Sequence, residues 1–133
     1  MTRHVLDSFA LLAYLRGEPG ADDVQELLEK AGRGKAHVWM CDVNYAEVQY
    51  ITRRKSGAAS WERVFEALKT LPIDFIPTSQ ALADQAAKFK SGHKLSLADA
   101  FAAALAKDRK AELVTGDPEL RVLSSEIRIR WLE

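Results

Sequence analysis

One segment, residues 97–106, constrains the fold of this chain more than any other part of the sequence. It is rich in Ala and Leu and contains no Gly, Pro or β-branched residue, so it favours an α-helix. The segment is apolar on all sides, which is typical of a helix that is covered on most of its faces. Asp99 is its only polar side chain. A carboxylate in such a place is desolvated unless it opens on a cleft or is compensated by a cation, a basic partner or the positive end of the helix.

The rest of the chain alternates short apolar runs with helical segments. Strands are predicted at residues 4–6, 36–41, 73–76, 112–115 and 127–132. Helices are predicted between them at residues 9–15, 21–31, 43–55, 61–71, 80–90 and 97–106. Strands separated by helices predict an α/β layer fold with a mostly parallel five-stranded sheet, whose last strand lies at an edge.

The totals indicate a soluble globular protein. We expect 133 residues to form a single domain, 1–133, and the apolar fraction of 47% argues against disorder. No apolar run approaches the roughly 20 residues of a membrane helix, and no secretory signal is present, so we expect a cytoplasmic protein without a membrane partner. The single cysteine, Cys41, excludes an internal disulfide. The 19 basic and 19 acidic residues balance, which neither requires nor excludes nucleic acid.

Two more carboxylates lie at the ends of predicted strands. Asp7 follows the first strand directly, and Asp117 follows the fourth after one intervening glycine. Each has a simple structural explanation, because Asp7 or Ser8 can cap the next helix, and Asp117 is a good N-cap before Pro118. However, the carboxyl ends of parallel strands share one edge of the sheet, where ligands bind in open α/β folds. We therefore expect Asp7 and Asp117 at the same edge.

Glu47 is unexpected within its predicted helix. At about 100° per residue it falls between Val43 and Ile51, inside the apolar arc. A glutamate at this position either reaches solvent, pairs with a basic residue or has a function, and the residues leave all three open. Whether Asp99 meets the other acids depends on the tertiary path, which the periodicity does not determine.

Four carboxylates that meet without basic partners repel one another, and a hard divalent cation removes the conflict. Mg²⁺ at such a site suits hydrolysis of a phosphodiester. Ser8 and Thr115 place hydroxyls beside two of the acids, where they can orient a water molecule. The three histidines and Cys41 have no zinc-type spacing, so no zinc site is predicted.

Four segments resemble, in order and spacing, the four acidic motifs of PIN-domain nucleases: residues 5–8 (VLDS), 44–47 (NYAE), 95–100 (LSLADA) and 113–118 (LVTGDP). The short chain looks like the VapC toxins of type II toxin–antitoxin pairs, and the resemblance covers essentially all of it. It implies a three-layer α/β/α fold with the strand order 3-2-1-4-5 and an endoribonuclease that depends on Mg²⁺ or Mn²⁺. It also implies a homodimer and inhibition by a cognate VapB-type antitoxin, which commonly places a basic side chain among the acids.

The resemblance also assigns residues. Thr115 matches a hydroxyl two positions before the last acid, and Ser8 matches the small polar residue after the first acid. Phe9 departs from the Asn or Ser that is frequent at its position, and Leu120 departs from Phe. The metal ligands implied by the motifs, with Glu47 acting directly or through water, are Asp7, Glu47, Asp99 and Asp117.

The primary hypothesis is therefore an RNA-cleaving PIN toxin. Basic residues either guide the RNA backbone or are solvated charges; those considered are Arg53, Arg54 and Lys94. A phosphatase that uses Asp7 as a phosphorylated nucleophile is disfavoured, because Phe9 stands where a second Asp would act as general acid. A third hypothesis is a catalytically silent PIN-like scaffold that binds RNA or a protein.

Overall fold

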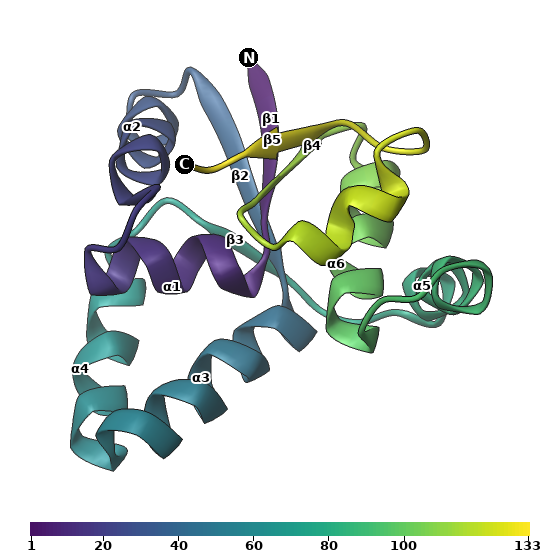
Figure 1. Cartoon of the computed structure of the whole chain (residues 1–133). Coiled ribbons are helices and arrows are strands. Elements are labelled where there is room, and N and C mark those ends of the chain that lie inside the picture. The colour runs from purple at the N-terminus through teal and green to yellow at the C-terminus, as the bar shows by residue number, and fades with distance from the viewer.

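The computed structural model describes residues 1–133 and contains one five-stranded sheet covered by helices on both faces (Figure 1). The strands are β1 (Thr2–Leu6), β2 (Ala36–Cys41), β3 (Asp74–Ile76), β4 (Glu112–Thr115) and β5 (Ile129–Trp131). The α-helices are α1 (Ser8–Arg16), α2 (Ala21–Gly32), α3 (Asp42–Ser56), α4 (Ala58–Leu68), α5 (Gln80–Gly92) and α6 (Leu97–Asp108). A 3₁₀ helix, η1 (Pro118–Leu123), precedes β5. No helix has both the length and the apolar character that crossing a bilayer requires.

The sheet order is β3-β2-β1-β4-β5, and every neighbouring pair is parallel. This confirms the predicted order 3-2-1-4-5 and the three-layer arrangement. The strand order reverses between β1 and β4, where Leu6 is paired with Val114. In an open α/β sheet such a switch point leaves a crevice at the carboxyl ends of the two strands. The residues that follow β1 and β4 are Asp7 and the segment from Gly116 to Asp117.

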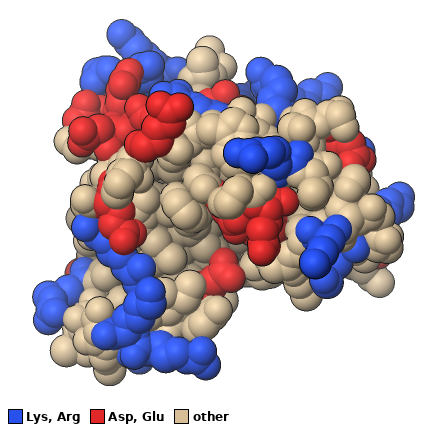
Figure 2. All heavy atoms as spheres, viewed as in Figure 1, with Lys and Arg blue, Asp and Glu red and all other residues tan.

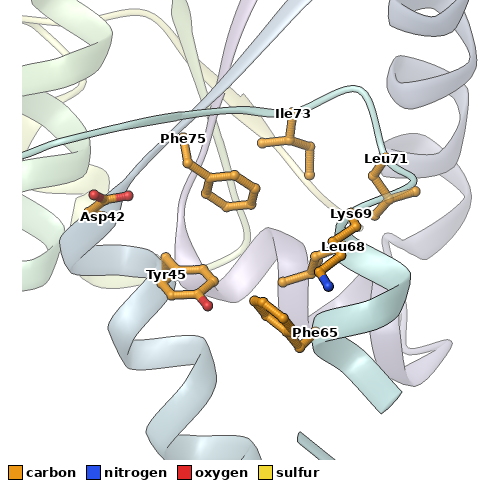
Figure 3. Close-up of a pocket in the computed structure, with 8 residues that line it drawn as sticks. All are labelled: Asp42, Tyr45, Phe65, Leu68, Lys69, Leu71, Ile73 and Phe75. Atoms are coloured by element: carbon orange, nitrogen blue, oxygen red, sulfur yellow. The ribbon is translucent and has the colours of Figure 1, made fainter. Parts of the chain in front are cut away.

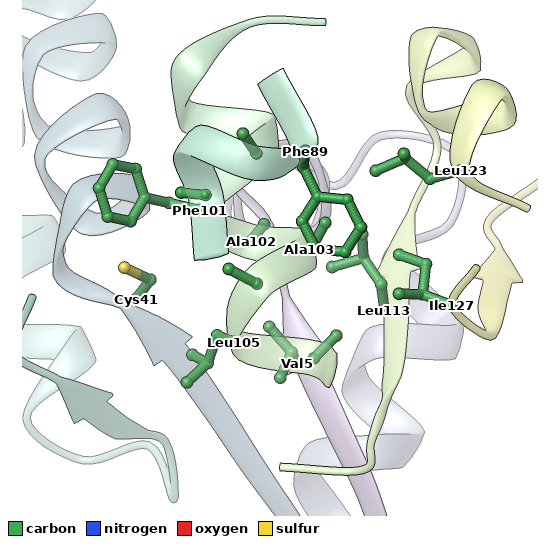
Figure 4. Packing of buried hydrophobic residues seen from close by; sticks show 14 of the residues in the cluster. Val5, Cys41, Phe89, Phe101, Ala102, Ala103, Leu105, Leu113, Leu123 and Ile127 are labelled. Atoms are coloured by element: carbon green, nitrogen blue, oxygen red, sulfur yellow. The ribbon is translucent and has the colours of Figure 1, made fainter. Parts of the chain in front are cut away.

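Each face of the sheet has its own apolar core, because successive side chains of a strand point to opposite faces. Val5 and Leu113 belong to the core under α5 and α6, and Leu6 and Val114 belong to the core under α1–α4. Figure 4 shows the first of these cores, with Val5 and Leu113 beside the helix that carries Ala103. Strands buried on both faces explain the continuous apolar runs in the sequence.

The helix α6 is buried over most of its length, as its apolar composition predicts. All residues from Asp99 to Ala106 are buried, and five of its alanines have no exposed surface. The helix begins as predicted, since the Ser96 hydroxyl accepts a hydrogen bond from the Asp99 amide at 3.1 Å.

Several boundaries differ from the predictions. The helix expected over residues 61–71 is α4, which starts at Ala58 and ends at Leu68, four residues before Pro72. Residues before a proline avoid the helical region, and the Ile73 amide instead closes a turn on the Leu71 carbonyl at 2.8 Å. The last strand is shorter than the run of apolar residues predicted, and the capped segment after Asp117 is a 3₁₀ helix.

Candidate metal centre

Asp7 stands at the end of β1 and is 1% exposed. Its Oδ1 accepts a hydrogen bond from the Ala10 amide at 2.9 Å and so caps α1. Its Oδ2 accepts a hydrogen bond from the Thr115 hydroxyl at the end of β4. The capping interpretation and the predicted position at the sheet edge therefore both hold for this one carboxylate.

Thr115 connects two of the acids. It is fully buried, and its Oγ1 donates to Asp7 and accepts a hydrogen bond from the Asp117 amide at 3.0 Å. Asp117 caps η1, where its Oδ1 accepts from the Glu119 amide at 3.0 Å. The Thr115 hydroxyl proton is thus used within the protein, where it positions Asp7 and Asp117. Its orientation of a water molecule stays a prediction.

Asp99 reaches the same edge from the first turn of α6. Suitable oxygens of Asp99, Asp117 and Glu119 all lie within 4.8 Å of one another. Asp99 is buried, Asp117 is half-buried and Glu119 is exposed. Glu119 has no role in the sequence prediction. The signal that points to it is its position in the short segment after Asp117, on the same turn as Pro118.

Glu47 lies on α3 and is half-buried. Its charge contributes to raising the pKa of Asp99, so the two carboxylates are near enough to interact electrostatically. None of the carboxylates that gather here forms a salt bridge with a Lys, Arg or His of the chain. We call this group the acidic cluster; it consists of Asp7, Glu47, Asp99, Asp117 and Glu119.

The electrostatics of the acidic cluster follow from burial and like charge. Burial is the largest cause that raises the pKa of Asp7 to about 7, and the charges of Asp99 and Asp117 add to it. Burial also raises the pKa of Asp99 to about 6, with Asp117 and Glu47 contributing. Hydrogen bonds from Thr115 and the Ala10 amide to Asp7 act in the opposite direction but do not outweigh the burial.

Ser8 and Asn44 form a buried link beside the acidic cluster. The Asn44 amide nitrogen donates to the Ser8 hydroxyl at 3.3 Å and to the Ala98 carbonyl at 3.2 Å. The Ser8 hydroxyl in turn donates to the Asn44 carbonyl at 3.4 Å. These bonds join α1, α3 and α6. Asp7 caps the first of these helices, and Glu47 and Asp99 lie on the other two. The sequence analysis places Asn44 at the start of the motif that ends at Glu47 but did not predict its buried hydrogen bonds.

The Asn44 side-chain oxygen has no hydrogen-bond partner, although the residue is completely buried. Buried polar atoms are nearly always hydrogen-bonded, so this oxygen is an exception.

Phe9 occupies the position where the family pattern favours Asn or Ser. A Cβ added at Gly116 would lie 2.2 Å from the Phe9 ring, so the ring rests against the backbone between β4 and Asp117. Phe9 keeps 43% of its surface exposed. A hydrophobic ring therefore covers the glycine beside the acidic cluster.

Acidic and basic side chains lie side by side on this face. Figure 2 shows acidic side chains near the middle of the view, over the region of η1 and the start of α6, with a basic group directly above them and a second acidic patch at the upper left. Arg53 and Arg54 lie in the last turn of α3, where Arg54 stacks 5.4 Å from the centre of the Tyr50 ring. Lys94 is exposed between α5 and α6. Their contact with RNA stays a prediction.

A different hollow lies between α3, α4 and β3. It has a volume of about 350 Å³ and is mostly apolar, with Tyr45, Phe65 and Phe75 around it (Figure 3). It contains a single carboxylate, Asp42, and none of the predicted acids. It therefore lacks the groups that would hold a cation or activate water.

The acidic cluster fits a hard divalent cation. All of its donors are carboxylate oxygens, which Mg²⁺ and Mn²⁺ prefer, and three of them are close enough to share one ion. Burial and the neighbouring carboxylates raise the pKa values of two of its acids, Asp7 and Asp99. A cation supplies the missing charge without adding a hydrogen-bond donor to a crowded site.

The fold is shared with solved structures of VapBC proteins. One is VapBC2 from Rickettsia felis bound to a DNA fragment from its promoter, with 14% identity, a TM-score of 0.76 and coverage of 99% of this chain and 100% of the other. VapBC-1 from nontypeable Haemophilus influenzae has 17% identity, a TM-score of 0.72 and 98% coverage of both chains. VapC20 of Mycobacterium tuberculosis, a toxin that cleaves the sarcin–ricin loop, has 14% identity, a TM-score of 0.70 and coverage of 93% and 95%.

Comparison with curated protein sequences gives no match. The PIN domain family model, in contrast, matches residues 4–125, which include β1 from His4 onward, all of β2, β3 and β4, and every member of the acidic cluster. Because the match covers most of the sequence and the observed strand order is the one its motifs imply, the chain belongs to the PIN domain family.

Proposed function

We propose that this protein is a VapC-type toxin, an endoribonuclease that hydrolyses RNA phosphodiester bonds with Mg²⁺ or Mn²⁺ at the acidic cluster. The observation that carries the proposal is the meeting of Asp99, Asp117 and Glu119 within 4.8 Å, beside buried Asp7, with no basic side chain of the chain to neutralise them. Membership of the PIN domain family and the fold shared with VapBC proteins support it.

The five acids fall into two groups in this proposal. Asp99, Asp117 and Glu119 would hold the cation directly, and Asp7 and Glu47 would complete the site directly or through water. When bound, the cation supplies charge neutralisation at the scissile phosphate and lowers the pKa of an attacking water.

The chain's own residues provide the frame for this chemistry. Thr115 holds Asp7 and Asp117 in register across β1 and β4. The buried link of Ser8 and Asn44 fixes α3 against the start of α6, which sets the separation of Glu47 from Asp99. Glu47 is half-buried and free of a basic partner, so it can accept a hydrogen bond from a water molecule and orient it.

The acidic cluster also explains how a partner would inhibit the protein. A VapB-type antitoxin that inserts an Arg or Lys among the acids would neutralise them and exclude the cation. Two similar solved structures contain VapBC proteins, which supports an antitoxin partner for this chain. We also propose a homodimer, as the family resemblance implies.

The test is cleavage of RNA by the purified chain. Wild type should cleave in Mg²⁺ or Mn²⁺ and stop in excess EDTA. Asp99→Asn and Asp117→Asn should each lower the rate by at least about a hundredfold, since the loss of even a supporting group around a metal costs roughly 10–100-fold. The matched control is Asp108→Asn, which removes an exposed carboxylate at the other end of α6 and should cleave like wild type.

Cleavage that survives in a folded Asp99→Asn, Asp117→Asn double variant would overturn the nuclease proposal. If wild type binds RNA but neither binds Mn²⁺ in calorimetry nor cleaves, the silent PIN-like scaffold is the better description. Growth arrest on expression, relieved by the antitoxin encoded beside the gene, tests the toxin role separately.

A further inference from the structure

A second charged site lies at the N-terminal ends of the strands, opposite the acidic cluster at their carboxyl ends. A pocket of about 450 Å³ is formed at the N-terminal ends of the strands, and β1 separates it from Asp7. Four residues of extended chain, from Arg3 to Asp7, span about 13 Å. We call this the basic pocket. Its charged lining residues are Arg3, Lys30, Lys110, Glu112, Arg128 and Arg130.

The cations of the basic pocket come from separate parts of the chain. One cation comes from each of five places: β1, α2, the turn between α6 and β4, the residue before β5, and β5 itself. Figure 2 shows Lys and Arg side chains along the upper edge of the molecule, where Figure 1 places the N-terminal end of β1. In a chain with no net charge, this convergence balances the acids at the other edge.

Three of the five cations lack a carboxylate partner: Arg3, Lys110 and Arg128 form no salt bridge. Two are instead oriented by backbone carbonyls. Arg3 Nη1 donates to the Arg109 carbonyl at 3.1 Å, and Arg128 Nη2 donates to the Lys110 carbonyl at 3.3 Å. Both guanidiniums are thus directed to one turn and keep further N–H groups for a ligand.

The one carboxylate of the pocket, Glu112, is already engaged. Its Oε1 lies 2.7 Å from the Nδ1 of buried His4 and 3.8 Å from Arg130 Nη1. Its charge therefore offsets Arg130 and leaves the three unpaired cations without a counter-ion.

Lys110 has an unusual backbone for its residue type. It has a φ of 52° and is the only residue other than glycine with a positive φ. It ends α6 in a left-handed cap, in which the Ala111 amide donates to the Ala106 carbonyl at 2.9 Å, and glycine is the favoured residue there. The helix dipole alone does not explain the lysine, because Lys107 and Arg109 already place cations at this helix end.

We infer that the basic pocket binds a compact, multiply charged phosphate group, such as pyrophosphate or the triphosphate of a nucleotide. Only two of its ten lining residues are apolar, Met1 and Leu27, none is Phe, Tyr or Trp, and His4 is buried, so it offers little surface on which a nucleobase would stack. The cations surround a single concave space, which suits a compact anion better than an extended backbone. Guanidinium N–H groups are the preferred donors for phosphate oxygens.

The experiment measures binding of pyrophosphate to the purified chain by calorimetry at low salt, in EDTA. Without divalent metal the acidic cluster repels the anion, so binding there does not contribute. We expect binding by wild type that weakens as salt increases. The double variant Arg3→Gln, Arg128→Gln should lose at least about tenfold in affinity, the effect of one charge-assisted hydrogen bond. Lys88→Gln, an exposed lysine on α5 outside the pocket, is the matched control and should bind like wild type.

Lys110→Gly separates binding from folding. It removes a cation and relieves the left-handed backbone, so it should melt about 2–6 °C higher than wild type while it binds pyrophosphate more weakly. Failure of wild type to bind pyrophosphate, or equal binding by the double variant, would overturn the inference. Because no RNA is cleaved in this assay, its outcome is independent of the proposed nuclease.

Two further ligands identify the source of the phosphates. Nucleoside triphosphate that competes with pyrophosphate indicates a free nucleotide. Competition by a short RNA with a 5′-triphosphate, but not by the same RNA with a 5′-hydroxyl, indicates an RNA end. Equal competition by the 5′-hydroxyl RNA would contradict a compact anion site and favour the phosphodiester backbone.

Discussion

The structural contacts of Asp7 and its proposed role as a metal ligand place opposite demands on its charge. It caps α1 and accepts a hydrogen bond from the Thr115 hydroxyl of β4, and it makes both contacts at a buried position. Burial raises its pKa to about 7. The negative form that a cation needs is therefore the form that the metal-free fold tolerates least.

At the residue scale, the first prediction concerns pH. Between about pH 4 and pH 7 the folded chain holds protons on Asp7 and Asp99 that the unfolded chain has lost, because their folded pKa values are raised to about 7 and about 6. These two groups therefore make the free energy of unfolding decrease as pH rises through this range. Asp7→Asn, which is neutral at every pH, should melt higher than wild type at pH 7.5 in EDTA and match it more closely at pH 5.

Wild type must be compared with the variant at each pH, because His4 changes the free energy of unfolding with pH in the opposite direction. Burial lowers the pKa of His4, so its contribution to stability is lost as pH falls. If Asp7→Asn melts lower than wild type at pH 7.5 in EDTA, the destabilising charge assigned to Asp7 is wrong.

The second prediction concerns Asn44. Asn44→Ala removes the two hydrogen bonds that the buried Asn44 amide donates to Ser8 and Ala98, so it should cost about 1–3 kcal/mol of stability. Ser8→Ala, which keeps the Asn44 contact to Ala98, should cost less. Urea unfolding of the three proteins gives the values. An Asn44→Ala chain as stable as wild type would show that the buried link does not hold α3 to α6.

At the element scale, α6 approaches the sheet closely because its buried face is made of alanine. Ala102, Ala103, Ala104 and Ala106 have no exposed surface. Small side chains let the helix axis lie near the strands, and this proximity brings Asp99 to the sheet edge. The small size of the α6 side chains is thus as important for the position of Asp99 as the helical propensity of the segment.

The third prediction tests that spacing. Ala103→Leu forces extra methylenes into a filled core and should cost about 1–3 kcal/mol, with reduced RNA cleavage because Asp99 is displaced. Ala87→Leu on the exposed side of α5 makes the same chemical change and should alter the free energy of unfolding by less than about 0.5 kcal/mol. Equal effects of the two substitutions would argue against a tightly packed α6.

The fourth prediction concerns the contact between α1 and the segment after β4. Gly116→Ala places a methyl group 2.2 Å from the Phe9 ring, so the ring or the backbone next to Asp117 must move, at about 1–3 kcal/mol. Adding Phe9→Ser, the small polar residue of the family pattern, should recover most of that loss. A double-mutant cycle from thermal melts measures the coupling, and additive effects would show that the two positions do not interact.

At the scale of the whole molecule, acids gather at one edge of the sheet and unpaired cations at the other. Parallel strands make this separation possible, because all five carboxyl ends lie together. Each edge then suits a ligand of opposite charge, a cation at one and an anion at the other.

The fifth prediction follows from linkage. A cation that binds only the folded chain stabilises it by about 2.7 kcal/mol at a concentration one hundred times its Kd. Mn²⁺ should therefore raise the melting temperature of wild type by several degrees. The rise should be absent in the Asp99→Asn, Asp117→Asn double variant and retained in Asp108→Asn. A rise of equal size in all three proteins would place Mn²⁺ outside the acidic cluster.

Local patterns in the sequence were sufficient for the elements and for part of the site. Apolar runs buried on both faces predict parallel strands, and Asp7 and Asp117 mark helix starts that the structure confirms. Asp7 and Asp117 follow strands, so their shared edge follows from parallel pairing alone. These inferences succeed because they depend on neighbours within a few positions along the chain.

Other parts of the site required the tertiary structure. The hydrogen bond from Asn44 to Ala98 joins positions 54 apart, and that from Thr115 to Asp7 joins positions 108 apart. Such contacts depend on which strand lies beside β1 and on how closely α6 packs against the sheet. The hydrophobic periodicity of the sequence gives neither the strand order nor this packing distance. By itself the sequence determined the layers, the caps and the two acids at strand ends. The approach of Asp99 to those acids and the convergence of five cations at the opposite ends of the strands were decided only in three dimensions, because these residues come from segments that are distant in the sequence.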